Sequence, residues 1–200
     1  MNLQNLFELQ KQLDEHIEKI HPRQEGEDRL AKKILALQVE LAECAQESRC
    51  FKYWSHNQEP RLKGYKEIKC KWCNGSGDDG TGVCPDCRSS GDVYKEYNPL
   101  LEEYVDCLHF ILSIGLELNI PVIYGTETKW DELTSDETDI TQQFLLVFEN
   151  VNKLVHPIDW INLFEEFYIL GEMLGFTCEQ IEQAYLDKNK INHERQENSY

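Results

Sequence analysis

The 200-residue sequence lacks any apolar run of 18 residues. This absence excludes a conventional membrane-spanning helix, because a span needs about 20 consecutive apolar residues. The first residues carry acids early, and they lack the basic segment followed by an apolar segment that marks a secretory signal. We therefore expect a cytoplasmic protein in a reducing compartment, with no membrane partner.

Positive charge is also scarce. The sequence has 20 Lys and Arg residues against 37 Asp and Glu residues, and its formal net charge is −17. A surface of this sign repels phosphate backbones, so we expect no broad nucleic-acid binding. A nucleotide substrate would need cations to bridge it to the protein.

Long strand patterns and internal repeats are missing as well, and helical periods dominate. The apolar spacing predicts helices over residues 3–20, 27–55, 98–119, 138–155, 158–174 and 177–196. A looser acidic stretch covers residues 124–137. The fold class we predict is all-α: a helical bundle formed by residues 1–59 and 97–200, interrupted by a small insertion at 60–96.

The insertion contains two CxxC pairs in the stretch "CKWCNGSGDDGTGVCPDC". They consist of Cys70, Cys73, Cys84 and Cys87. Each pair presents two thiolates to one tetrahedral ion, and glycine in the turns lets backbone N–H groups approach the sulfurs. Four thiolates close the coordination shell, so we predict one structural Zn²⁺ ion. Disulfides or a redox pair are the alternatives, and both fit a cytosolic chain poorly.

Carboxylates mark two of the predicted helices. Glu40, Glu43 and Glu47 follow steps of three and four beside the apolar stripe of the helix at 27–55. An acidic edge of this kind usually faces water. The helix at 98–119 changes the interpretation, because it is apolar nearly all round and still carries Glu103 and Asp106.

Those two buried carboxylates need a positive partner. Each would cost several kcal/mol without one, and residues 96–118 contain no Lys or Arg. A metal ion is the economical partner. Hard oxygen ligands on two facing helices suit Mg²⁺, which takes the rest of its shell from water and from substrate phosphates.

The motifs "ELAE" at 40–43 and "EYVD" at 103–106 resemble the ExxE and ExxD pairs of the all-α nucleotide pyrophosphohydrolases, the MazG-like superfamily. Within it the sequence is most similar to the dimeric dUTPases. The likeness covers four stretches in order: "LQKQLDEHI", "VELAECAQESRCFKYWS", "EEYVDCLHFILSIGL" and "YLDKNKINHERQENSY". Residues 60–96 depart from the family, whose metal-binding helices are joined by a much shorter segment, so the resemblance implies no function for them.

The resemblance implies a dUTP diphosphatase whose catalytic domain is the helical bundle. It implies hydrolysis of dUTP, and also of dUDP, with water attacking the α-phosphate of dUTP to give dUMP and pyrophosphate. Two or more Mg²⁺ ions would be held by the catalytic carboxylates Glu40, Glu43, Glu103 and Asp106. Among these we assign to Glu40 the further task of orienting or deprotonating the attacking water.

The resemblance also implies a set of substrate-binding residues. Phe110 would stack on the base, Lys52 and Trp54 would belong to the block that closes over it, and Gln10 would contact the nucleotide. Three would meet the phosphates along one face of the last helix: Lys188, Asn192 and Arg195. Four of them have a structural alternative: core packing for Phe110, an anchor at a helix end for Trp54, and a solvated helix end for the cations Lys188 and Arg195.

The relatives imply a homodimer, and the apolar residues of the helices at 138–174 exceed what one small bundle needs. His109 is expected to be a hydrogen-bonded interior histidine. Two other functions stay open. One is a sister enzyme that cleaves another nucleotide, such as dCTP or one with a damaged base. The other is a non-enzymatic helical protein whose zinc knuckles bind a partner.

Overall fold

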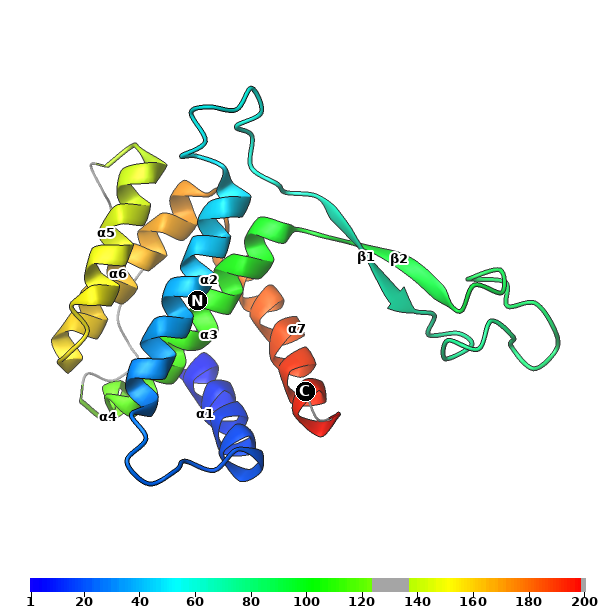
Figure 1. The fold of residues 1–200 in the computed structure, drawn as a ribbon, viewed down its shortest axis with the longest axis horizontal. Helices are drawn as coiled ribbons and strands as arrows, with labels where there is room; N and C mark the ends of the chain where they lie inside the picture. The colour runs from blue at the N-terminus through cyan, green and yellow to red at the C-terminus, as the bar shows by residue number, and fades with distance from the viewer. Residues whose placement is uncertain (124–136, 199–200) are drawn as a thin grey trace. The chain divides into compact units, whose positions relative to one another are not determined.

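The computed structural model describes residues 1–123 and 137–198, and these form two compact units (Figure 1). The helical unit contains Met1–Pro60 and Leu100–Tyr200, and the hairpin unit contains Arg61–Pro99. Of the acidic stretch predicted at 124–137, all but Glu137 lies outside the described residues. Within the described ranges, no helix is long and apolar enough to cross a membrane.

The predicted all-α class is confirmed for the helical unit. Its helices are α1 (Leu3–Ile20), α2 (Arg29–Ser48), α3 (Pro99–Glu117), α4 (Ile120–Ile123), α5 (Ile140–Asn152), α6 (Pro157–Met173) and α7 (Cys178–Glu197). The start of α7 follows from the sequence, since Thr177 and Gln180 form a capping box. The Gln180 N–H donates to Thr177 Oγ1 at 3.3 Å, and the Thr177 N–H donates to Gln180 Oε1 at 3.0 Å.

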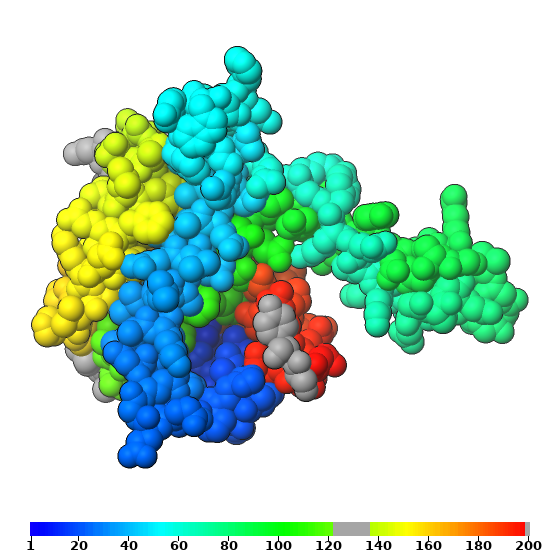
Figure 2. Space-filling model, in the orientation of Figure 1, coloured from blue at the N-terminus to red at the C-terminus, as the bar shows by residue number. Residues whose placement is uncertain are grey.

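Several helix boundaries differ from the prediction, and two of the differences have a clear cause. The second helix ends at Ser48 instead of residue 55, because Arg49 adopts a left-handed conformation with φ of 60°. Residues 50–60 continue in turns and project from the end of α2 (Figure 2). The third helix ends at Glu117, and the short α4 follows Asn119, which has φ of 57°. Pro121 did not exclude α4, since proline is accepted in the first turn of a helix.

Helix α3 lies in the middle of the hydrophobic core. Its buried residues point in several directions, and they are Leu100, Tyr104, Val105, Cys107, Leu108, Ile111, Leu112 and Ile114. Trp160 of α6 is fully buried against it and donates from Nε1 to the Ile111 carbonyl at 2.7 Å. Because so much of α3 is covered, its acidic residues, Glu102, Glu103, Asp106 and Glu117, are only partly exposed.

The hairpin unit is built on two strands that the sequence analysis missed. Strand β1 (Gly64–Lys69) pairs antiparallel with β2 (Asp92–Tyr97), so that Gly64 faces Tyr97 and Lys69 faces Asp92. Both strands are short, and much of their surface is exposed. A strand with polar residues on both faces gives little apolar alternation, which is the signal that sequence analysis depends on.

Two matching knuckles lie between the strands, at residues 70–78 ("CKWCNGSGD") and 84–92 ("CPDCRSSGD"). In each, a serine hydroxyl donates to the carbonyl of the second cysteine, at 2.7 and 2.8 Å, and a glycine N–H donates to that cysteine's sulfur, at 3.2 and 3.3 Å. The residues are Ser76, Cys73 and Gly77 in the first knuckle, and Ser90, Cys87 and Gly91 in the second. The expectation of no internal repeat was therefore wrong, because this repeat spans only nine residues.

A glycine lets three helices approach closely. A Cβ atom on Gly115 of α3 would lie 2.9 Å from Phe7 Cε1 of α1 and 2.9 Å from Trp160 Cε2 of α6. Both rings are buried, and their centroids are 5.6 Å apart. No side chain fits between them without a shift of one ring, so the residue type at 115 fixes how near α1 and α6 come to α3.

We predict that Gly115→Ala destabilises the protein by about 1–3 kcal/mol, the usual cost of an extra methyl group in a packed core. The free energy of unfolding, measured by denaturant titration, checks this. Glu172→Ala, at an exposed position on α6, is the control and should change that free energy by less than about 0.5 kcal/mol. Equal stability of Gly115→Ala and the parent protein would show that α1 and α6 can move apart freely.

Candidate functional site

Three carboxylates from two helices meet at one point of the helical unit. Glu40 and Glu43 come from α2, and Glu103 comes from α3; one oxygen of each lies within 4.8 Å of the others. On α2 the core positions Leu37 and Leu41 are fully buried. The two glutamates are therefore turned to the edge of that face, where α3 adds the third carboxylate.

The electrostatics of this cluster favour a bound cation. Burial, followed by the charges of Asp106 and Glu43, raises the pKa of Glu40 to about 7. Burial and the neighbouring carboxylates raise the pKa of Glu103 to about 7 as well. Negative groups that repel one another in this way gain most from a divalent cation, and carboxylate oxygens are the ligands that Mg²⁺ prefers.

Asp106 has a partner that sequence analysis did not find. Its Oδ2 atom accepts a hydrogen bond from Lys188 Nζ of α7 at 2.5 Å, and the same ammonium lies 3.3 Å from Glu102 Oε1. Lys188 is only 8% exposed. Burial opposes its charge, but Asp106 and Glu102 together raise the pKa of Lys188. Residues 96–118 contain no cation for Asp106, because its partner Lys188 lies on a helix more than 80 residues further along the chain.

A cleft of about 860 Å³ opens beside the carboxylates, lined by residues of α1, α2, α3 and α7. It brings together six of the predicted site residues: Gln10, Glu40, Asp106, Phe110, Asn192 and Arg195. Glu43 and Glu103 adjoin Glu40, and Lys188 adjoins Asp106, without lining the cleft. Four helices far apart in the sequence thus converge on one cavity.

Lys52 and Trp54 are not brought to the cleft. They lie in the turns after α2, where Trp54 is 65% exposed and packs edge-on against Phe51 and Tyr53. Lys52 Nζ lies 5.7 Å from the centre of the Phe51 ring. Trp54 is not an anchor at a helix end, because α2 ends at Ser48, six residues earlier.

Helices α2 and α3 run antiparallel along the cleft. Glu40 and Glu43 adjoin Glu103, whereas Lys33 Nζ lies 2.9 Å from Glu117 Oε1. The cleft therefore has an acidic end at Glu40 and Asp106 and a distal end at Lys33 and Glu117, with Ala36 and Phe110 at intermediate positions along the helices.

A buried network anchors α1 to α3 and α7. Gln10 Nε2 donates to Asp14 Oδ1 at 2.7 Å, so the Gln10 amide oxygen faces Tyr185 and His109. The Tyr185 hydroxyl donates to that oxygen at 2.9 Å, and His109 Nδ1 lies 2.9 Å from it. Burial, followed by the charge of Lys188, lowers the pKa of His109 to about 3, so the ring is neutral and donates from Nδ1. His109 is a hydrogen-bonded interior histidine, as predicted.

The distal end carries an ion-paired cluster that sequence analysis did not assign. Asp14 Oδ2 accepts from Ser113 Oγ at 2.5 Å and from Lys33 Nζ at 3.2 Å. Glu117 accepts from Lys33 and, at 2.6 Å, from Arg23. One sequence signal could have pointed to this cluster, since Lys33 precedes Glu40 by seven residues and Ser113 follows Asp106 by seven. That separation returns to nearly the same helix face.

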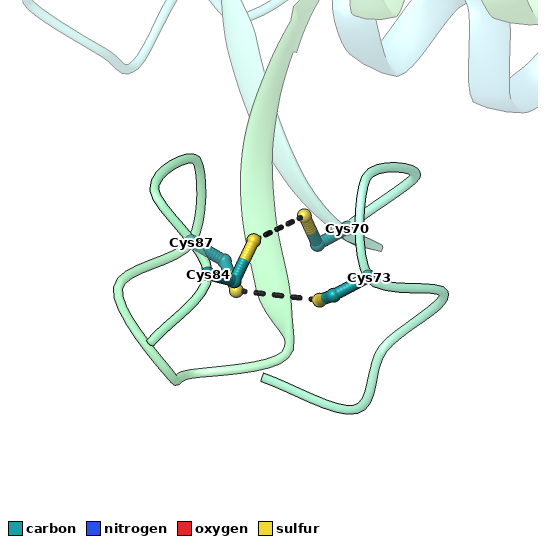
Figure 3. Close-up of side chains that lie close together, drawn as sticks. All are labelled: Cys70, Cys73, Cys84 and Cys87. Atoms are coloured by element: carbon teal, nitrogen blue, oxygen red, sulfur yellow. Dashed lines mark hydrogen bonds between the residues drawn. The ribbon is translucent and has the colours of Figure 1, made fainter. Parts of the chain in front are cut away.

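The four knuckle cysteines form a second cluster, in the hairpin unit (Figure 3). The Cys70 and Cys84 sulfurs are 3.8 Å apart, and the Cys73 and Cys87 sulfurs are 3.6 Å apart. These distances exceed a disulfide bond of about 2.05 Å, and all four thiols are free and buried. The cluster can hold a metal ion, and the backbone N–H groups of Gly77 and Gly91 would stabilise its thiolates.

Sequence comparison agrees with this geometry. A family model described as dUTPase matches residues 2–68 and 90–200. The unmatched residues 69–89 contain the cysteine cluster, whereas both matched segments supply walls of the cleft. Comparison with curated proteins and with solved structures found no match. On the family match over most of its length, and in keeping with its mainly helical fold, the chain belongs to the all-α dUTPase family.

Proposed function

We propose that this chain hydrolyses dUTP, and also dUDP, in a Mg²⁺-dependent reaction at the cleft beside Glu40 and Asp106. The products from dUTP would be dUMP and pyrophosphate. The observation that carries the proposal is the meeting of three carboxylates from α2 and α3 next to a cleft of about 860 Å³ that also contains Phe110 and Arg195. The family match supports the choice of nucleotide.

Glu40, Glu43 and Glu103 would hold the metal, and we assign Asp106 to the same set. The donor set fits two or more Mg²⁺ ions, since it is made of hard oxygens whose mutual repulsion a divalent cation relieves. Bound Mg²⁺ supplies positive charge for the phosphate oxygens and makes a coordinated water more acidic. Lys188, which now neutralises Asp106, would be available to the phosphates once metal takes that task.

The protein's own residues would do the remaining work. Glu40 lines the cleft, and we assign to it the orientation or deprotonation of the water that attacks the α-phosphate. Arg195 and Asn192 of α7 both line the cleft. They would stabilise the negative charge that develops on the departing pyrophosphate. Phe110 would stack on the base. Gln10 makes three hydrogen bonds, to Asp14, His109 and Tyr185, and would hold the α1 side of the cleft in position.

The test is release of pyrophosphate from dUTP, with and without EDTA. Glu43→Gln removes one charge from the carboxylate cluster and should lower kcat/KM by at least about 100-fold, while the far-ultraviolet circular dichroism stays that of the parent. Glu43 is exposed, so its replacement should not disturb packing. Arg195→Ala should give a similar loss if it holds a phosphate, since charge-assisted contacts to a developing anion are worth a few kcal/mol.

Glu179→Gln, at the first turn of α7 and outside the residues that line the cleft, is the matched control and should keep full activity. A panel containing dCTP separates this proposal from a sister enzyme. Parental rates in Glu43→Gln, or turnover insensitive to EDTA, would contradict the assignment of the carboxylates.

We propose further that the four cysteines bind one structural Zn²⁺ ion. Four sulfurs placed tetrahedrally around zinc at about 2.3 Å lie about 3.8 Å from one another. The separations of 3.8 and 3.6 Å between two of the sulfur pairs agree with that arrangement, and all four sulfurs lie within 4.8 Å of one another. A cytoplasmic location, which we also propose, would keep the thiols reduced and able to bind metal.

Metal analysis of the purified, reduced protein should find one zinc per chain, and Cys73→Ser should remove it. Because the cluster is confined to residues 70–87, the loss should increase amide exchange in the hairpin unit while dUTP turnover remains. Cys50→Ser, outside the cluster, should keep the zinc. A reduced sample without zinc, or Cys73→Ser with full zinc content, would refute the site.

We also propose a homodimer. Most of the apolar residues in the helices at 138–174 are buried in the chain's own core, so they no longer support an interface. Other apolar side chains on the adjoining helices α2 and α5 are exposed, namely Leu35, Val39, Leu145 and Leu146. Burial of such side chains drives association. Light scattering should give twice the chain mass of 23.5 kDa, and a single-chain mass at micromolar concentration would refute the dimer.

A further inference from the structure

Lys33 stands at the distal end of the cleft with an unusual set of partners. Its Nζ atom lies 3.2 Å from Asp14 Oδ2 of α1 and 2.9 Å from Glu117 Oε1 of α3. The side chain is 16% exposed, and it lines the cleft. Because carboxylates from two helices hold the ammonium from either side, it cannot move away without breaking an ion pair.

One of the three N–H bonds of the Lys33 ammonium is not used in a hydrogen bond within the described part of the protein. An ammonium has three N–H bonds, and Asp14 and Glu117 account for two of them. Within residues 1–123 and 137–198, the third has no protein partner. Asp14 is differently placed, since it already accepts hydrogen bonds from Gln10, Ser113 and Lys33. Lys33 can therefore still donate a hydrogen bond to a ligand at the distal end.

The spacing along α2 relates this donor to the acidic end. Lys33 precedes Glu40 by two helical turns, which is about 10 Å along the axis, and it lies on nearly the same face. Ala36 of α2 and Phe110 of α3 fall between the two ends. The space from the carboxylates past Phe110 to Lys33 matches the extent of a nucleotide that lies with its phosphates at the acidic end and its base against the phenyl ring.

The chemistry of a pyrimidine nucleotide then decides what meets Lys33. The sugar is attached at N1, and the ring position opposite N1 is C4. A nucleotide with its phosphates at the acidic end therefore directs its C4 substituent toward the distal end. That substituent is a carbonyl oxygen in uracil and an amino group in cytosine.

We propose that Lys33 is a specificity-determining residue of this site, whose ammonium donates a hydrogen bond to the carbonyl oxygen at C4 of uracil. This rests on the proposed function, because it takes the phosphates to lie at the acidic end. A cytosine amino group is itself a donor, so it would leave the partly buried ammonium of Lys33 without this hydrogen bond. Sites built in this way discriminate strongly, because the analogue leaves a polar group unpaired.

Asp14 and Glu117 act as positioning residues for the ammonium. Ser113 and Gln10 hold Asp14, and Arg23 holds Glu117, so each carboxylate is itself fixed by a second donor. A lysine on a free side chain would reach either base edge by rotation. Held between two fixed carboxylates, it presents its remaining N–H in a restricted direction.

The experiment measures dissociation constants of dUMP and dCMP by calorimetry, so the readout does not require catalysis. The parent protein should bind dUMP at least about tenfold more tightly than dCMP, corresponding to one hydrogen bond gained or lost. Lys33→Met removes the donor, and the preference should fall to about twofold or less. Lys33→Gln keeps a donor for Asp14 or Glu117 and adds an acceptor, so it should also lose the preference while retaining more of the ion-pair cluster's stability.

Lys32→Met is the matched control. Lys32 is the adjacent residue and also lines the cleft, but its side chain is 71% exposed and pairs with Glu27. It should bind dUMP and dCMP with the parent's preference. An unchanged preference in folded Lys33→Met or Lys33→Gln would overturn the role of Lys33.

Pyrophosphate release from dUTP by the same samples separates the two proposals. A parent protein that prefers dUMP but releases no pyrophosphate would remove the proposed function and leave the role of Lys33 standing. A parent protein that turns over dUTP, with lysine variants of unchanged preference, would do the reverse. Failure to bind either nucleotide would overturn both.

Discussion

The ion pair between Lys188 and Asp106 joins the last helix to the helix at the centre of the core. It brings a positive charge to a group of carboxylates that burial and repulsion disfavour. It also holds α7 against α3, and α7 supplies Asn192 and Arg195 to the cleft. The same contact therefore compensates charge and forms one wall of the cavity. A buried pair of this kind adds little net stability over an apolar contact, but removing one partner is costly.

Charge compensation follows a common plan at both ends of the cleft. At the acidic end, three carboxylates lie together with few nearby cations, and an external cation can complete them. At the distal end, Asp14 and Glu117 share Lys33, and Arg23 adds a second positive charge. The first arrangement suits exchangeable ions, whereas the second is complete within the chain. A cleft with these two ends can bind metal and phosphate at one and an uncharged polar group at the other.

Local features of the chain were predictable from the sequence, and contacts between distant segments were not. The capping box at Thr177, the apolar character of α3 and the two CxxC pairs each depend on neighbouring residues. The Lys188 pair and the Lys33 cluster depend on how four helices pack, and helical periods do not specify which faces meet. The end of α2 was misplaced because the left-handed conformation of Arg49 has no distinctive residue type. The strands were missed because their two faces are similarly polar.

The antiparallel pairing of β1 and β2 has a consequence for how this chain acquired its extra residues. Gly64 and Tyr97 are opposite partners in the ladder, so the two ends of the hairpin unit emerge side by side. The hairpin unit therefore begins and ends at neighbouring positions of its own ladder. Loop-closure entropy grows only slowly with length, and here the ladder offsets it locally. The family match ends after residue 68 and resumes at residue 90, which places the boundary of the added material at the tip of that ladder, where chain growth leaves the geometry of the stem unchanged.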